Sequence, residues 1–174
     1  MADGVKIARV VWGRWAALVA FGVGFGYVEA AVVHYLRRIL DDQAITDIEA
    51  ARTYLDLKFI AFIEPERTVL VDPRLTNIET VREAATLLML GAVAWIAATT
   101  WRRRVAAFFV AFAVWDMTYY LFLWVLNGWP ASVFDRDVFF LIPVAWVGPV
   151  LTALVASTLV LVAASCVYLR TPRT

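Results

Sequence analysis

Two carboxylic acids interrupt long apolar stretches of this sequence. Glu29 follows fourteen uncharged residues that begin at Trp15, and Asp116 lies in an otherwise uncharged run from Val105 to Leu126. Ionisable side chains within membrane-spanning segments are rare, face the interior of a bundle, and mark ion or substrate sites. Two such acids close together in a low dielectric repel each other unless a cation neutralises them. Glu29 and Asp116 therefore predict a site for a proton, a metal ion or a cationic group.

The composition indicates that much of the surface faces lipid. Of 174 residues, 63% are hydrophobic and 18% charged, whereas soluble domains are about half apolar and about a quarter charged. The length allows one domain. The net charge of +1 gives no reason to expect nucleic acid as a partner. The only cysteine, Cys166, excludes an internal disulfide, and the only histidine, His34, makes a bis-histidine haem unlikely within one chain.

Charged residues divide the chain into four apolar spans. Fourteen residues rise only ~21 Å as a helix, short of the ~30 Å hydrocarbon core, so the first span must carry Glu29 into the membrane. Arg102, Arg103 and Arg104 end the second span. We predict an all-α membrane protein that forms a single transmembrane domain of four transmembrane helices with an outer interfacial segment. The expected spans are 15–36, 83–101, 105–126 and 150–169, with an outer loop at 37–82.

Two segments leave alternatives open. The 32 uncharged residues from Val138 to Leu169 would make ~48 Å of helix. Pro149 suits a first helical turn, which leaves 138–148 along the outer interface or dipping in and returning; one long helix kinked at Pro149 is an equal alternative. In the outer loop we favour an amphipathic surface helix over a hairpin that turns at 64–67 into 68–71. The helix rests on the spacing of Ile45, Ile48, Leu55, Phe59 and Phe62, and the hairpin on the alternation of 55–59.

Lysine and arginine set the expected orientation. With four spans, the N-terminal tail, the turn at 102–104 and the C-terminal tail share a side. Both sides hold eight basic residues, but those of the termini lie in short segments and those of the loops are mixed with acids. Both ends of the chain are therefore predicted to be cytoplasmic.

Counting along each helix at ~1.5 Å per residue places the polar groups in depth. From Arg14, Glu29 lies ~22 Å along; from Arg104, Asp116 lies ~18 Å along. Polar groups from three helices thus fall in two adjacent layers of the outer half. The deeper layer holds Glu29, Asp116, Thr86, Tyr119 and Tyr120, and the rim holds His34, Arg82 and Glu83.

These layers predict an outward-facing polar pocket. Glu29 and Asp116 are the expected ligands or proton acceptors, supported by Glu83, Arg82, Thr86, Tyr119 and Tyr120. With His34 as a third ligand, the two acids would suit a metal ion such as Mn, Fe, Zn or Ca. The alternative is structural: Glu29 pairs with Arg82, and Asp116 bonds to a neighbouring helix.

Small residues recur every four positions in the first span, at Gly22, Gly26 and Ala30. This stripe is typical of a face that packs closely against another helix.

Five segments together resemble a family of small bacterial membrane proteins that has no known activity. They are Gly26–Ala31, Arg82–Thr86, Val114–Tyr120, Gly128–Pro130 and Phe140–Val150. The resemblance implies a multi-pass protein of the bacterial inner membrane with four spans, and it implies no reaction.

Two functions remain open. The first is transport or membrane-bound chemistry at the carboxylate pocket, with the lipid bilayer as the immediate partner. The second is an accessory or scaffold subunit whose small-residue stripe and Trp-rich faces dock further copies or other membrane proteins.

Overall fold

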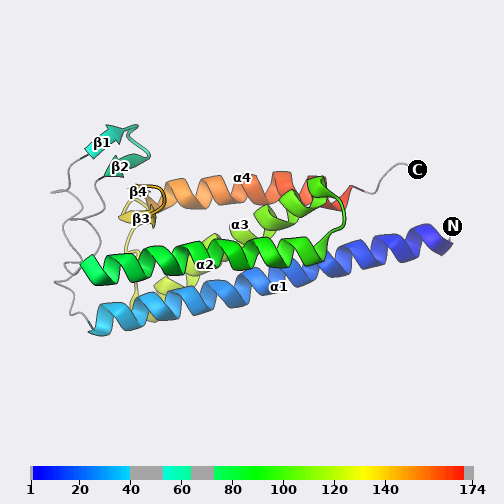
Figure 1. Ribbon diagram of the computed structural model, residues 1–174, viewed down its shortest axis with the longest axis horizontal. Helices are drawn as coiled ribbons and strands as arrows, with labels where there is room; N and C mark the ends of the chain where they lie inside the picture. Colours follow the sequence, from blue (N-terminus) through cyan, green and yellow to red (C-terminus); the bar gives the residue numbers. More distant parts are fainter. Residues whose placement is uncertain (1, 40–52, 64–72, 171–174) are drawn as a thin grey trace.

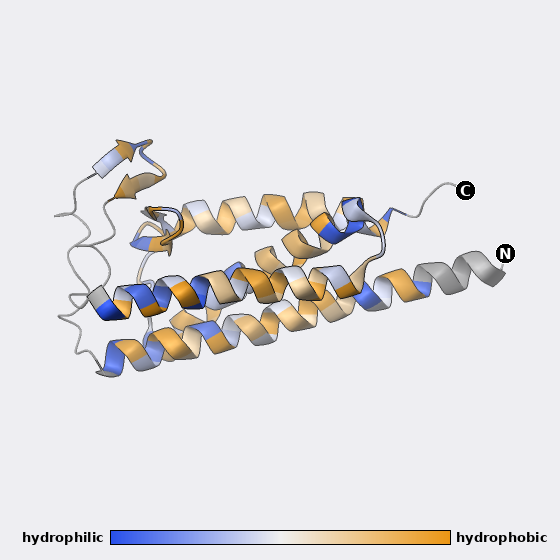
Figure 2. Ribbon diagram, in the orientation of Figure 1, coloured by the Kyte–Doolittle hydropathy of each residue, from blue (hydrophilic) through white to orange (hydrophobic). Residues whose placement is uncertain are grey.

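The computed structural model describes residues 2–39, 53–63 and 73–170. Four helices, α1 (Ala2–Ile39), α2 (Pro73–Ala97), α3 (Trp101–Asn127) and α4 (Val150–Leu169), are long and apolar enough to cross a membrane, as expected for a small multi-pass membrane protein. Apolar residues run along all four helices (Figure 2). The prediction of an all-α protein is wrong in one respect, because four short strands form an antiparallel sheet. They are β1 (Thr53–Asp56), β2 (Ala61–Ile63), β3 (Arg136–Phe140) and β4 (Ala145–Pro149).

The helices form one elongated bundle with distinct ends (Figure 1). The start of α1, the α2–α3 turn and the last turn of α4 lie at one end, called here the terminal end. There Arg103 Nη2 donates a hydrogen bond to the carbonyl of Arg170 at 2.7 Å. The sheet lies at the opposite end, called the sheet end. The start of α1 and the end of α4 thus lie at the same end of the bundle; that this end is cytoplasmic stays a prediction.

Local signals explain where the helices begin and end. α3 ends at Gly128, whose φ of 69° suits a residue without Cβ and whose N–H bonds to the Trp124 carbonyl at 2.8 Å. α2 begins at Pro73, a favoured first helical residue, rather than near residue 83. Glu79 and Arg82 therefore lie within α2 and not in a loop before it, and Glu83, expected at the start of the span, lies well inside the helix.

The outer loop contains a hairpin between residues 53 and 63, so the predicted amphipathic helix is wrong there. Thr53 pairs with Ile63, and Asp56 pairs with Ala61. Lys58, with a φ of 69°, turns the chain, and its N–H donates to Asp56 Oδ1 at 2.7 Å. The alternation of residues 55–59 predicted this hairpin better than the helical spacing did, although the turn comes earlier than residues 64–67. Residues 40–52 and 64–72, which include Ile45 and Ile48, lie outside the described residues.

The segment before α4 also forms a hairpin. β3 and β4 pair with each other, and β4 pairs with β2 through Ala61 and Val147, so the strand order is β1-β2-β4-β3. α4 begins at Val150, as predicted, and the single kinked helix is wrong. Pairing of β4 with β3 and β2 satisfies backbone hydrogen bonds of the segment before α4.

The small-residue stripe packs against α3 of the same chain. A Cβ on Gly22 would lie 2.8 Å from Val114 Cβ and 2.9 Å from the Ala111 carbonyl oxygen. Ala30, on the same face, is fully buried. The predicted close-packing face is confirmed, and its partner is internal.

Candidate functional site

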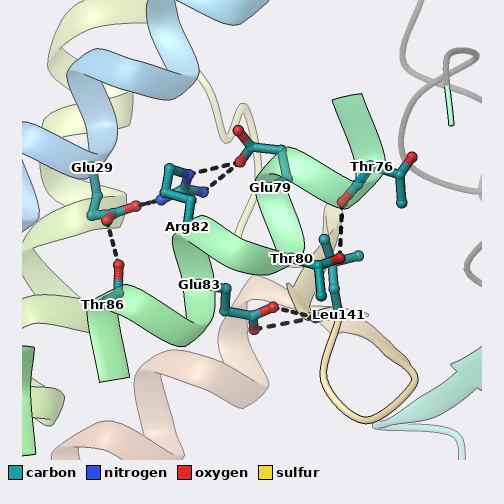
Figure 3. Close-up of polar contacts among 8 residues, drawn as sticks. All are labelled: Glu29, Thr76, Glu79, Thr80, Arg82, Glu83, Thr86 and Leu141. Carbon is teal, nitrogen blue, oxygen red and sulfur yellow. Dashed lines mark hydrogen bonds and ion pairs between the residues drawn. The ribbon is translucent and has the colours of Figure 1, made fainter. Parts of the chain in front are cut away.

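Glu29 is held by two side chains of α2, Arg82 and Thr86, both of which contact its carboxylate in Figure 3. Arg82 Nη1 pairs with one carboxylate oxygen, and Thr86 Oγ1 donates to the other at 2.9 Å. Arg82 also binds Glu79 through Nη2 at 2.6 Å. One guanidinium therefore serves two carboxylates. Glu29 and Thr86 are buried, with 6% and 3% of their surfaces exposed. We call Glu29, Glu79, Arg82 and Thr86 the α1–α2 ion network.

Glu83 turns away from this network, although it follows Arg82 in sequence (Figure 3). Its two carboxylate oxygens accept the backbone N–H of Leu141 at 3.1 and 2.9 Å. Leu141 follows β3, so Glu83 ties the β3–β4 hairpin to α2. The sequence did not predict this contact, because it left the structure of the segment around residue 141 open.

Asp116 has a separate partner on α4. Ser157 Oγ donates to Asp116 Oδ2 at 2.7 Å, and Ser157 is buried with 5% of its surface exposed. In the part of the chain that the structure describes, no ion pair joins Asp116 to a basic side chain. The sequence placed Glu29 and Asp116 in one layer; in the structure each has its own partners on a different helix. Ser157 was missed, although it lies ~20 Å along α4 from Arg170, close to the depth of Asp116.

Tyr120 connects α3 with the sheet. Tyr120 lies one turn after Asp116, and its hydroxyl donates a hydrogen bond to Asp137 Oδ2 at 2.9 Å. The rings of Tyr119 and Tyr120 lie 5.0 Å apart, and Tyr119 interacts electrostatically with Asp137, Arg82 and Glu29. Asp137 was not predicted as a site residue, because it lies in a polar loop in the sequence and enters the site only through β3.

His34 lies near the last turns of α1 and bonds to Asn127 Oδ1 through Nδ1. The partner of His34 is thus different from the partners of Glu29 and of Asp116. Among residues 2–39, 53–63 and 73–170, no three His, Cys, Asp or Glu side chains gather closely enough to hold a metal ion. The predicted metal ligands Glu29, Asp116 and His34 therefore gain no geometric support, and the ligand set stays a prediction.

No family model, curated protein or solved structure matches this chain. The resemblance to small bacterial membrane proteins is thus not tied to a family and supplies no site residue. The multi-pass arrangement rests on the four apolar helices, and the bacterial inner membrane stays a prediction.

Burial raises the pKa of the Asp137 carboxyl to about 6, although the Tyr120 hydroxyl and the Arg37 guanidinium partly oppose this. The unfolded chain has a value near ~4, so between about pH 4 and 6 the folded protein binds a proton that the unfolded chain releases. This contribution to stability is complete below about pH 4 and is lost as the pH rises through about 6. We expect the unfolding temperature of the wild type in detergent, relative to Asp137→Asn, to fall across this window.

Asp56→Asn is the control for this titration, because Asp56 lies in the exposed hairpin strand β1. It should keep the pH dependence of the wild type. An Asp137→Asn protein with the same decline between about pH 4 and 6 would contradict the assignment.

Proposed function

We propose that this protein binds and releases protons within the membrane, with Asp116 as the proton acceptor, and that this serves proton-coupled transport. The observation that carries the proposal is the contrast between two acids of the spanning helices. Glu29 is neutralised by Arg82. Asp116 has the Ser157 hydroxyl and no basic partner among the residues described.

A proton is the ligand that suits Asp116 best. A carboxylate within a membrane span and without a counter-ion is costly, and a proton removes its charge without needing further ligands. A metal ion needs several oxygen or nitrogen ligands, which the described residues do not bring together. The Ser157 hydroxyl can donate to the carboxylate or accept from the carboxylic acid. The hydrogen bond between α3 and α4 can therefore persist in both protonation states.

Tyr120 and Asp137 supply a route for protons from the sheet end. Asp116 and Tyr120 are four residues apart and share a face of α3. Tyr120 donates to Asp137, and Asp116 interacts electrostatically with both groups. In the predicted orientation the sheet end faces outward. The proposed site thus exchanges protons with the outer solution. The framework around it is supported by Glu29, Glu83, Arg82, Thr86 and Tyr119.

The accessory-subunit alternative has one observation in its favour, because Glu29 forms the structural ion pair that it expects. Its docking stripe, however, is occupied by α3 at Gly22 and Gly26. Docking would then have to use the exposed tryptophans of the helices, which also suit the interfaces of a bilayer. They include Trp12, Trp95, Trp101 and Trp124.

The decisive experiment follows Asp116 directly. In reconstituted protein, infrared difference spectroscopy between pH 5 and 8 should show a protonated carboxylic acid band that disappears in Asp116→Asn and is separate from the Asp137 band, which Asp137→Asn identifies. Asparagine can keep a hydrogen bond to Ser157, so we expect this variant to fold. The band should shift in frequency in Ser157→Ala, because its hydrogen bond is lost, and remain unchanged in Asp56→Asn. Dye-reported proton uptake into liposomes should fall at least about tenfold in Asp116→Asn, as for loss of a positioned acid–base group.

An unchanged band and unchanged proton uptake in Asp116→Asn would refute the proton site. If the same variant altered only the assembly of the protein with other membrane proteins, the accessory function would be supported instead.

A further inference from the structure

Two hydrogen-bond donors are buried without an acceptor at the sheet end, where the spanning parts of α1 and α3 finish. They are Arg37 Nε and Asn127 Nδ2. Buried donors without partners are uncommon and call for an explanation such as an ion or a ligand. In the described chain the other two such atoms are Nε1 of Trp115 and Nε1 of Trp146. Both indoles belong to an aromatic cluster around Phe140, and their ring centroids lie 6.4 and 6.3 Å from the centroid of the Phe140 ring.

Neighbouring side chains hold the two donors in place. His34 occupies the carbonyl oxygen of the Asn127 amide, which leaves its nitrogen for another group. Arg37 follows His34 by one helical turn, and its guanidinium carbon lies 4.4 Å from the centroid of the Trp129 ring. Trp129 comes two residues after Asn127, so the cation and the amide belong to one locality. The Trp129 ring holds the guanidinium by a cation–π interaction, but it offers no hydrogen-bond acceptor to the N–H groups in the guanidinium plane.

The charges favour an anion with several oxygen atoms. Asp137 interacts electrostatically with Arg37, but it accepts a hydrogen bond from the Tyr120 hydroxyl and is not within ion-pair distance of Arg37. A guanidinium binds phosphate oxygens through two parallel N–H groups, and an amide N–H can reach a further oxygen. The donors of Arg37 and Asn127 therefore suit one phosphate group.

The depth of the site indicates where that phosphate comes from. The spanning segment of α1 ends at Arg38 and that of α3 at Asn127, so Arg37 and Asn127 lie where the hydrocarbon core gives way to headgroups. Basic side chains at the ends of spanning helices reach the headgroup level, where a guanidinium can bind lipid phosphates. We propose that Arg37 and Asn127, with His34 and Trp129 as positioning residues, bind the phosphate of a phospholipid headgroup. This site uses neither Asp116 nor Ser157, and lipid binding is measured separately from proton uptake, although Arg37 interacts electrostatically with Asp137 of the proposed proton route.

Two adjacent arginines provide a matched test. Arg38 has the same charge and lies exposed on the next position of α1. The probe is dioleoyl phosphatidylglycerol added to the detergent-purified full chain, with bound lipid counted by native mass spectrometry. We expect Arg37→Gln and Asn127→Ala each to weaken lipid binding roughly tenfold, as for loss of a charge-assisted hydrogen bond, and Arg38→Gln to change it less than about twofold.

Arg37→Lys separates geometry from charge, because lysine keeps the charge and lacks the planar fork. It should bind the lipid several-fold more weakly than the wild type. Competition with inorganic phosphate distinguishes the sources. No displacement at millimolar phosphate supports a lipid headgroup, whereas full displacement would overturn the lipid assignment. Equal losses in Arg37→Gln and Arg38→Gln, or wild-type binding by Arg37→Lys, would overturn the site; unfolding temperatures show that each variant is folded.

Discussion

Replacing Arg82 by leucine should lower the free energy of unfolding by about 2–4 kcal/mol, because it leaves two acids in the membrane without their cation. Arg82 pairs with both Glu29 and Glu79, and Glu29 is 6% exposed. Breaking a buried ion pair costs ~3–5 kcal/mol, and we expect somewhat less here because the Arg82 side chain is 31% exposed. The measurement is reversible unfolding in mixed micelles with increasing denaturant.

The network predicts an asymmetry between its partners. Glu29→Gln should cost less than Arg82→Leu, because Arg82 keeps Glu79 and the new amide oxygen can still accept a hydrogen bond from the Thr86 hydroxyl. The double variant Glu29→Gln/Arg82→Leu should be more stable than the sum of the single losses predicts, by about 1 kcal/mol or more. Arg102→Leu, at an exposed position of the terminal end, is the control and should change little. Additive losses would show that Arg82 and Glu29 are not coupled.

Replacing Gly26 by alanine should cost about 1–3 kcal/mol, as overpacking does in well-packed cores. A Cβ at this position would lie 2.9 Å from the Trp115 carbonyl oxygen and 3.0 Å from the Tyr119 nitrogen. The Cβ would also meet the Thr118 hydroxyl, whose side chain can rotate, but the other two atoms belong to the backbone of α3 and cannot move aside in that way. The helices α1 and α3 must separate, and Glu29, one turn further along α1, would move relative to Tyr119. The effect can be measured by thermal unfolding and by the proton uptake of reconstituted protein.

Gly24 is the matched control for this steric argument. A Cβ on Gly24 meets no heavy atom within 4 Å. Gly24→Ala should therefore be neutral or stabilise the protein by up to ~1 kcal/mol through its higher helix propensity. Equal effects at Gly24 and Gly26 would mean that the close approach of α1 and α3 does not limit stability.

The features that the sequence predicted well are those encoded locally. The four spans follow from the length of uncharged runs, and the start of α4 follows from Pro149, because both depend on consecutive residues. The stripe of Gly22 and Gly26 likewise repeats on one face of a single helix. Depth along each helix could also be counted, because the rise per residue is constant.

Pairing between distant segments was decided only by the tertiary structure. Depth along a helix does not determine rotation about its axis, so Glu29 and Asp116 could share a level and still bind Arg82 and Ser157 on different helices. Residues 53–63 are compatible with both a helical and an alternating pattern, and the pairing of β2 with β4 comes from a strand more than eighty residues away. Asp137 joins Tyr120 for the same reason: the β3–β4 hairpin folds back onto the end of the bundle, a contact between segments that no local pattern encodes.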